Sequence, residues 1–269
     1  MIAVSALLAT SLAVPARAET INCTPITTLP AVISTQGIYC LTGNLATNIT
    51  SGNAITITAN NVTLDLNGWK LGGQGGGMAT QAAGILSGAD NVTIKNGIVR
   101  GFYYGIYLTG RGGVVQDMLM DQNTHIGIAV FGQGSIVEHN QVVDTGGSTA
   151  EPSVTAIGIE TALGSGSLVV NNVVSGLTAT GSLDEYGIAM TGLNSVARDN
   201  IVNDDAGPTG GGTSLGIFQY QSDSITVNNT VSNFAWGIYN TAAGIYAHNT
   251  VNNCTTSYYG GVAGVGNSP

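Results

Sequence analysis

Charged residues are scarce in this sequence, and basic residues are the scarcest of them. Charged side chains make up 8% of the 269 residues, with 6 Lys and Arg against 15 Asp and Glu and a net charge of −9. Such a chain is expected to repel nucleic acid and anionic membrane surfaces. It is also a poor trap for polyuronates unless a local cation patch or bound Ca²⁺ intervenes. Hydrophobic residues reach 43%, which excludes a disordered chain.

Cysteines and long apolar runs are also few. The longest apolar stretch lies in residues 1–18, "MIAVSALLATSLAVPARA", and is too short to span a bilayer. Although no Lys or Arg precedes it, its small-x-small ending predicts an export signal cleaved after Ala18, and hence a secreted or periplasmic protein. An exported chain can oxidise its cysteines, so we expect a disulfide between Cys23 and Cys40 that ties down the N-terminal segment. Cys254 is left over and is interpreted as a buried free thiol.

What the sequence does contain is a repeat of about 21 residues or slightly more. A Gly-Ile pair opens a β-rich stretch at Gly84, Gly105, Gly127, Gly158, Gly187, Gly216 and Gly237. A second β-rich run with an Asn follows each pair in all but the second of these units, at Asn96, Asn140, Asn172, Asn200, Asn229 and Asn249. In that unit Met118 stands where the spacing would place the Asn. A unit with three short strands and no helix predicts one turn of a parallel β-solenoid, of about 8 coils.

The Asn residues explain an oddity of the stretch "GSLVVNNVVSG", residues 166–176. Strands usually avoid Asn, yet Asn171 and Asn172 interrupt an apolar run. We expect Asn172 to lie at a corner between two strands, pointing inward, where its amide bonds to the Asn of the coils above and below. Such an inward Asn ladder is structural, because it satisfies amides that would otherwise be buried alone.

These residues resemble the right-handed parallel β-helix proteins of the pectate-lyase-like superfamily, from about residue 54 to 261. The stretches "TPITTLPAVISTQGIYCLTGNL" and "AITITANNVTLDLNGWKLGG" are similar to the N-terminal part of secreted bacterial members. The resemblance implies an all-β right-handed parallel β-helix. We therefore expect a signal peptide at 1–18, an N-terminal cap segment at 19–53 and the β-helix at 54–269. No catalytic motif of the superfamily matches residue by residue, so the resemblance does not assign an activity.

By analogy with the superfamily, the Gly-Ile stretch is the first strand of each coil. If each Ile points inward, the residue after it points outward. The outward row is then Leu86, Tyr107, Ala129, Glu160, Ala189, Phe218 and Tyr239. Three coils are longer than the rest, with extra residues around 144–155, 175–186 and 203–214. These loops are expected to form a wall beside the row, and they bring several carboxylates to it.

Carboxylates and aromatic rings on one groove suit a carbohydrate. Glycoside hydrolysis needs two carboxyl groups, and the candidates are Glu160, Asp184, Glu185 and Asp205. The candidate substrate-binding residues are Tyr107, Arg111, Phe218, Tyr220, Trp236 and Tyr239. Further aromatics expected beside the groove include Phe102, Tyr103, Tyr104, Phe131 and Tyr186, and His125 is expected to reach it.

We expect a secreted protein that binds an extended polysaccharide along the first-strand groove, and whether it cleaves the chain stays open. The first alternative is a non-catalytic structural or adhesive β-helix. The second is a Ca²⁺-dependent polysaccharide lyase centred on Arg111, with Asp204 and Asp205 as a candidate Ca²⁺ ligand set. The histidine spacing fits no zinc site, and no other cofactor is expected. Nucleic-acid and membrane partners are not expected, whereas oligomers could form through the C-terminal coil.

Overall fold

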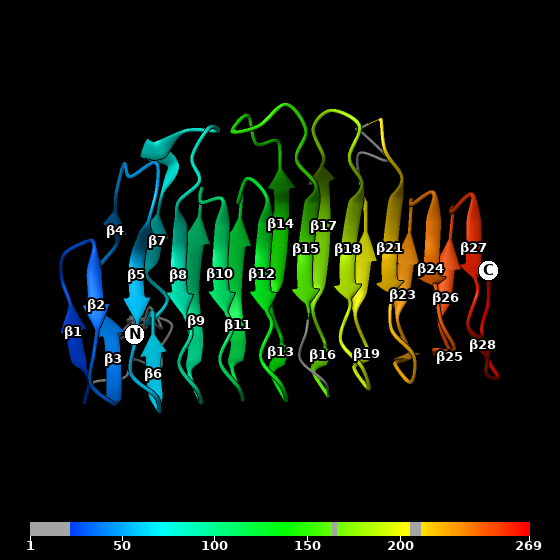
Figure 1. Ribbon diagram of the computed structural model, residues 1–269, viewed down its shortest axis with the longest axis horizontal. Helices are drawn as coiled ribbons and strands as arrows, with labels where there is room; N and C mark the ends of the chain where they lie inside the picture. The colour runs from blue at the N-terminus through cyan, green and yellow to red at the C-terminus, as the bar shows by residue number, and fades with distance from the viewer. Residues whose placement is uncertain (1–21, 163–165, 205–210) are drawn as a thin grey trace, which may run out of the picture.

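The computed structural model describes residues 22–162, 166–204 and 211–269. The expected signal peptide, residues 1–18, and the candidate catalytic residue Asp205 lie outside the described residues. Within them the chain winds into a parallel β-helix of two long sheets, with the first described strand at one end and the last strand at the other (Figure 1). A search for long apolar helices found none able to cross a membrane in the described part of the chain.

The first sheet has 10 parallel strands, one from each coil. They are β2 (Ala31–Ile33), β5 (Asn53–Ile57), β8 (Ala83–Ser87), β10 (Tyr104–Leu108), β12 (Ile126–Val130), β15 (Ala156–Thr161), β18 (Glu185–Met190), β21 (Ser214–Gln219), β24 (Trp236–Asn240) and β27 (Thr256–Tyr259). The Gly-Ile pairs lie in the seven strands from β8 to β24, as predicted. The sheet has two more strands than the predicted eight coils, and three of its strands, β2, β5 and β27, carry no Gly-Ile pair.

The second sheet has 18 strands and supplies the other two sides of each coil. Its strands are β1 (Thr24–Ile26), β3 (Gly37–Leu41), β4 (Leu45–Ala46), β6 (Val62–Asp65), β7 (Lys70–Gly72), β9 (Thr93–Arg100), β11 (Val114–Asp121), β13 (Ile136–Glu138), β14 (Gln141–Gly146), β16 (Leu168–Val170), β17 (Val173–Thr178), β19 (Val196–Arg198), β20 (Ile201–Asn203), β22 (Ile225–Val227), β23 (Thr230–Ser232), β25 (Ile245–Ala247), β26 (Thr250–Asn252) and β28 (Val262–Ala263). One 3-10 turn, η1 (Gln74–Gly76), is the only helical element in the described ranges.

Close packing inside the helix explains the Gly-Ile repeat. Ile159 and its equivalents in the other Gly-Ile strands are fully buried in the core. The preceding glycine lies where successive coils approach most closely. A Cβ added at Gly158 would lie 2.7 Å from the carbonyl oxygen of Gly187 in the next coil. No larger residue fits there, so the repeat is a packing requirement rather than a mark of function.

The corner at Asn171 and Asn172 shows why two amides stand together. Asn171 has a φ of 55°, a left-handed conformation that Asn tolerates better than most residues. Asn172 points inward, and its Nδ2 donates to Val137 O at 2.9 Å and to Asn200 Oδ1 at 3.0 Å. Its Oδ1 accepts from both nitrogens of Asn140. The first amide therefore turns the chain and the second joins the ladder.

The predicted Asn ladder is confirmed along five coils and extends further. Side-chain bonds of 2.9–3.0 Å link Asn140, Asn172, Asn200, Asn229 and Asn249 in order. Asn249 then donates to Asn267 Oδ1 at 3.3 Å, so the C-terminal tail continues the ladder. Met118 occupies the equivalent position before Asn140, as the spacing predicted, and its backbone N donates to Asn140 Oδ1.

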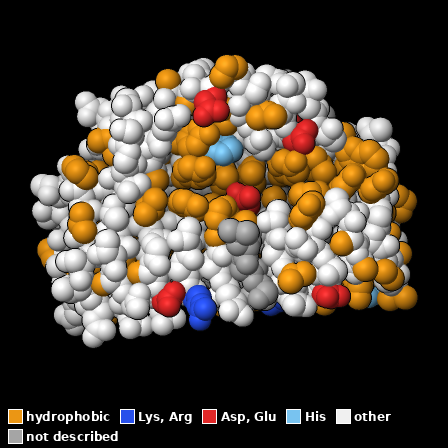
Figure 2. Space-filling model, in the orientation of Figure 1, with side chains coloured by type: hydrophobic (Ala, Val, Ile, Leu, Met, Phe, Trp, Pro, Cys, Tyr) orange, Lys and Arg blue, Asp and Glu red, His pale blue; other side chains and the backbone are white. Residues whose placement is uncertain are grey.

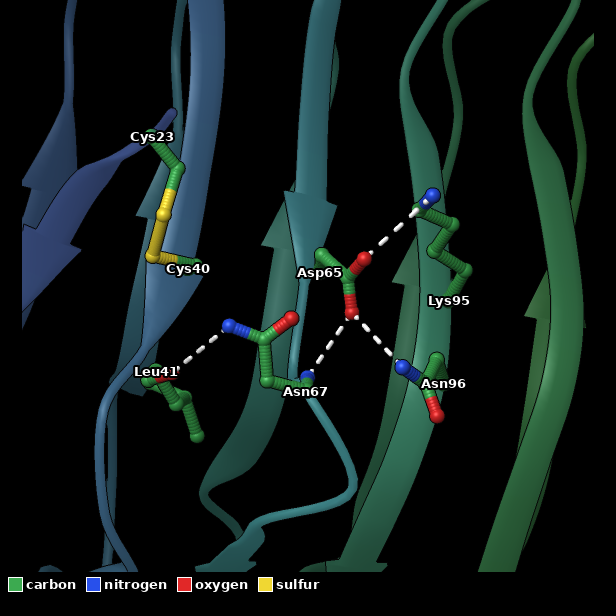
Figure 3. Close-up of a disulfide and its surroundings, with 7 residues drawn as sticks. All are labelled: Cys23, Cys40, Leu41, Asp65, Asn67, Lys95 and Asn96. Carbon is green, nitrogen blue, oxygen red and sulfur yellow. Dashed lines mark hydrogen bonds and ion pairs between the residues drawn. A yellow bond between two sulfur atoms is a disulfide. The ribbon is translucent and has the colours of Figure 1, made fainter. Parts of the chain in front are cut away.

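Asn96 is an exception to the prediction. Strand pairing places Gly97, not Asn96, opposite Met118, so Asn96 lies one residue before the ladder position. With a φ of 55°, it is the turning residue of its corner. Its Nδ2 donates to the buried carboxylate of Asp65 at 3.1 Å (Figure 3). Lys95 Nζ lies 3.3 Å from the other oxygen of Asp65, which makes this a separate polar cluster.

The expected disulfide between Cys23 and Cys40 is present (Figure 3). It joins the start of the described chain to β3. The segment expected to cap the helix contributes strands to both sheets, because β2 pairs with β5 and β3 pairs with β6. Residues 22–53 therefore continue the β-helix rather than lie across its end.

Candidate functional site

The outer face of the 10-stranded sheet carries the predicted row of outward residues. Strand pairing aligns Leu86, Tyr107, Ala129, Glu160, Ala189, Phe218 and Tyr239 in successive coils, and adds Tyr259 at the end. A second outward row runs beside it through Tyr104, Ile126, Ile157, Tyr186, Leu215 and Trp236. A hydrophobic band follows these strands across the face (Figure 2).

Two aromatic clusters divide this face into three parts. The N-terminal cluster contains Tyr103, Tyr104, Tyr107, Phe131 and the ring of His125, with neighbouring centroids 4.5–5.4 Å apart. The C-terminal cluster contains Tyr186, Phe218, Tyr220, Trp236, Tyr239 and Tyr259, with centroids 4.6–6.2 Å apart. Between the clusters the row consists of Ala129, Glu160 and Ala189. Both alanines are buried beneath neighbouring aromatic rings, and Glu160 is the one charged side chain of the row; this stretch is called the saddle below.

Glu160 projects from β15 into this saddle. Burial raises the pKa of its carboxyl group to about 7. No hydrogen bond or ion pair joins that group to the other residues the structure describes, so it is available to a ligand. Burial is the main cause that raises the pKa of Tyr104 on one side and of Tyr186 on the other, and the charge of Glu160 adds to it for both. Glu160 is therefore close enough to both aromatic clusters to act on a ligand that contacts both.

The long loops form the expected wall along one edge of the sheet, at the top of Figure 1. Backbone hydrogen bonds join each loop to the next. Gly147 N donates to Thr178 O at 2.6 Å, Val154 pairs with Thr180, and Gly211 N donates to Gly181 O at 2.9 Å. Because the described parts of neighbouring loops are bonded to one another, they form one wall along this edge of the sheet.

The two candidate acids from the middle loop have different environments. Asp184 lies at the rim, where Oδ2 accepts from the Tyr186 hydroxyl at 2.9 Å and Oδ1 accepts from Thr213 N at 2.7 Å. Glu185 is buried, and its Oε1 accepts from Ala179 N at 2.9 Å. Glu185 thus holds the loop in place, whereas the prediction put it on the wall facing the groove. The reason is register, since β18 already begins at Glu185.

A cavity of about 340 Å³ adjoins the C-terminal cluster. Its lining includes the rim carboxylate and the aromatic floor, and consists of Asp184, Tyr186, Thr213, Leu215, Phe218, Trp236, Tyr239 and Thr241. An apolar floor with a few polar groups at its edge suits a small ring-shaped ligand, and the volume is at the lower end of the usual range for ligand sites.

His125 stands on the wall side of the N-terminal cluster. Its Nδ1 donates to Thr155 O at 2.6 Å, which leaves Nε2 as the acceptor of a neutral imidazole. Burial lowers the pKa of His125, although the Thr155 bond and the charge of Glu151 oppose this effect. Burial is the main cause that raises the pKa of Tyr103, and the charge of Glu151 raises it further. This loop carboxylate therefore lies near the N-terminal cluster.

The remaining predicted residues differ in where they lie. Phe102 is fully buried in the core and is not a groove residue, although the prediction placed it there. Arg111 is exposed in the turn after β10, where its backbone N donates to Asp90 Oδ1 at 2.8 Å. No three His, Cys, Asp or Glu side chains within the described residues are grouped to hold a metal ion. Of the candidate Ca²⁺ pair, Asp204 is buried and Asp205 is outside those residues.

Some groove residues were missed from the sequence. Tyr259 stacks on Tyr239 with centroids 4.6 Å apart, but its coil reads Thr-Ser-Tyr-Tyr instead of carrying a Gly-Ile pair. Ile126 and Ile157 are buried on the outer face, under the aromatic clusters. Their signal was an apolar residue directly before each glycine, three residues before the row residue of the same strand.

Together, these features define a parallel β-helix with a solvent-facing aromatic groove on its first sheet. A family model described as "Right handed beta helix region" matches residues 82–258, and the chain belongs to this family. This confirms the expected right-handed parallel β-helix. A search of curated proteins found no significant match to the sequence.

Solved structures with the same fold come from several kinds of protein. The Dettilon tailspike protein gp208 has a TM-score of 0.63 and 17% identity over 91% of this chain and 59% of that chain. The A-module of the mannuronan C-5 epimerase AlgE4 of Azotobacter vinelandii has a TM-score of 0.54 and 13% identity over 90% of this chain and 86% of that one. Pectate lyase Pel9A has a TM-score of 0.52 and 13% identity, covering 90% and 71%. At these identities the likeness shows the fold alone, and the chain spans about three fifths of the tailspike.

Proposed function

We propose that the protein binds an extended polysaccharide along the outer face of the 10-stranded sheet. The observation that carries this proposal is the position of Glu160, in the saddle between two aromatic clusters and beside the wall. The groove follows the stacking direction of the coils, which are about 4.8 Å apart. From Tyr107 to Tyr239 it therefore extends roughly 25 Å, enough for several sugar units.

Sugar rings fit this surface chemically. Their C–H faces pack on aromatic rings such as Phe218 and Trp236, while hydroxyl groups bond to polar side chains at the edge. Two of the similar structures are named for action on mannuronan and pectate, which supports a carbohydrate ligand for this fold. The Cys23–Cys40 disulfide supports a secreted or periplasmic location, where such polymers are met.

Cleavage by hydrolysis is part of the proposal and depends on Glu160. A carboxyl group with a pKa of about 7 is protonated often enough near neutral pH to act as a general acid toward a glycosidic oxygen. Hydrolysis also needs a second carboxylate, and among the predicted acids Asp184, at the rim, is the candidate. It would have to act as a general base that takes a proton from water.

Binding without cleavage is the second candidate function. It is favoured by the state of Asp184, because both of its oxygens already accept hydrogen bonds from Tyr186 and Thr213. A carboxylate held in this way is poorly placed to take a proton from water. Elimination by a Ca²⁺-dependent lyase has the least support, because Arg111 lies in an exposed turn and no ligand group was found among the described residues.

The test is a panel of soluble polysaccharides titrated against the whole chain by calorimetry. For a polymer that binds, Phe218→Ala and Tyr239→Ala should each weaken binding by about tenfold, through loss of a stacking surface. Ile225→Ala, an exposed aliphatic position on the opposite sheet, is the matched control and should leave the affinity unchanged. Equal losses in all three variants, or none in the aromatic variants, would place binding outside the groove.

Cleavage is tested separately with the polymer that binds. New reducing ends that disappear in Glu160→Gln, while binding is retained, would establish hydrolysis with Glu160 in the site. Binding with no new reducing ends would establish the non-catalytic function. Ultraviolet absorbance from unsaturated uronates, dependent on Ca²⁺, would establish elimination instead.

A further inference from the structure

We infer that the groove selects an uncharged polysaccharide and discriminates against polyuronates. This inference rests on the proposed function and deepens it by naming the class of polymer. It starts from the distribution of charge, because no strand of the 10-stranded sheet contains a Lys or Arg. The basic groups visible on this face lie at its lower margin, away from the hydrophobic band (Figure 2).

Each basic residue of the described chain lies elsewhere. Lys95 is on β9 and pairs with Asp65 at 3.3 Å, and Arg100 ends the same strand and pairs with Asp121 at 3.0 Å. Arg198 is on β19 and pairs with Asp199, at 2.6 Å. Lys70 is on β7 of the 18-stranded sheet, and Arg111 is in the exposed turn after β10. None of these residues is part of the groove floor or of the wall.

The charged groups that do face the groove are acids. Glu160 occupies the centre of the floor, Asp184 the rim beside the C-terminal cluster, and Glu151 the wall beside the N-terminal cluster. A polyuronate chain along this face would bring a carboxylate close to these acids at several of its sugar units. With no cation opposite them, that repulsion is expected to weaken binding by roughly tenfold or more.

An uncharged glycan finds partners of the right kind in the same place. The aromatic rings offer stacking surfaces on both sides of the saddle. The Tyr104 hydroxyl, protonated at neutral pH like any phenol, can donate to a sugar oxygen, and the Tyr186 hydroxyl, which donates to Asp184, can still accept a hydrogen bond. Glu160 can donate a hydrogen bond to a sugar hydroxyl while it is protonated. A neutral polymer thus uses the groove without leaving a buried charge unpaired.

A bridging cation is the usual way for an acidic groove to hold an acidic polymer. Such a cation needs a group of oxygen ligands. No cluster of three His, Cys, Asp or Glu side chains occurs within the ranges the structure describes. The acids of the groove are instead dispersed over its floor, rim and wall, which favours a neutral ligand.

The experiment compares polymers that differ in charge but share a backbone. Polygalacturonate and its fully methyl-esterified form make one pair, chitosan oligosaccharides and their N-acetylated forms make a second, and soluble neutral glucans, galactans and mannans complete the set. Affinities for the whole chain are measured by calorimetry at 20 and 500 mM NaCl, with and without Ca²⁺. Uncharged polymers are expected to bind tightest, with less than about a twofold change between the two salt concentrations, because no ion pair is involved.

A triple variant, Glu151→Gln, Glu160→Gln and Asp184→Asn, provides an internal check. It should gain affinity for the acidic polymer relative to the esterified one, by about tenfold. Tight binding of polygalacturonate to the wild-type chain, with or without Ca²⁺, would overturn the inference and leave the proposed function intact. Tight, salt-sensitive binding of chitosan would do the same. No detectable binding to any of the polymers would overturn the proposed function itself.

Discussion

The carboxyl group of Glu160 should make the protein less stable as the pH rises. Burial raises its pKa from the ordinary value of 4.5 to about 7 in the folded chain. Between these two pH values the folded protein keeps the proton that the unfolded chain has released. Folding is therefore favoured at low pH, and the contribution is lost as the pH rises through this window.

The size of the effect follows from the two pKa values. The difference between 4.5 and about 7 corresponds to roughly 3 kcal/mol. Glutamine has nearly the same shape as the protonated acid and does not titrate. Glu160→Gln should therefore remove this part of the pH dependence, and above pH 7 the variant should be more stable than the wild-type chain by an amount approaching that value.

Urea unfolding of both proteins at pH 4.5, 6 and 8 measures this difference. The gap between wild type and Glu160→Gln should widen steadily with pH. Glu138→Gln makes the same chemical change on β13 of the opposite sheet, retains Glu160, and should keep the wild-type dependence. Parallel curves for wild type and Glu160→Gln would refute the reasoning, because they would mean that the carboxyl group is solvated and has no unusual pKa.

Two further predictions concern the fold. Asn172→Leu removes the acceptor of two donors of Asn140 and should cost about 2–5 kcal/mol, whereas Asn140→Leu removes the acceptor of one donor, the Met118 backbone N, together with the donor to Val115 O, and should cost about 1–3 kcal/mol. Equal losses in a denaturant titration would contradict the bonding of the ladder. Replacing Cys23 and Cys40 together by Ala should lower stability by about 3 kcal/mol in the absence of reductant, since the disulfide closes a loop with a sequence separation of 17. An unchanged midpoint would show that strand pairing alone fixes this segment.

The fold was predictable because its requirements recur in most coils. A glycine must stand where coils nearly touch, and an inward amide must continue the ladder, so both leave a periodic trace in the sequence. The outward row from Leu86 to Tyr239 followed from the same period, and strand pairing confirms its register. Prediction failed where a coil lacks the repeated residues, or where a similar residue stands one position away from the repeated one. Tyr259 belongs to a coil without a Gly-Ile pair, and Asn96 is a turning residue that resembles a ladder residue in sequence.

The site was less predictable because spacing shows which coil a side chain belongs to, but not what it contacts. Glu185 follows Asp184 directly, yet one lies on the rim and the other is buried against Ala179 N. That difference depends on where β18 begins, which the loop sequence does not indicate. Phe102 likewise belongs to an aromatic run whose other members, Tyr103 and Tyr104, are in the groove, while its own ring fills the core.

Glu160 is the residue of the outward row that most clearly lowers the stability of the fold. At the equivalent place neighbouring coils have alanine or an aromatic ring, which suits a half-buried surface. A carboxyl group there destabilises the folded chain at neutral pH by roughly 3 kcal/mol, and no described neighbour offsets it with a hydrogen bond. Conflicts of this kind in an otherwise consistent sequence are typical of functional positions. A ligand hydroxyl that donates a hydrogen bond to the carboxylate would offset this cost, which is why we propose that a ligand binds at this part of the face.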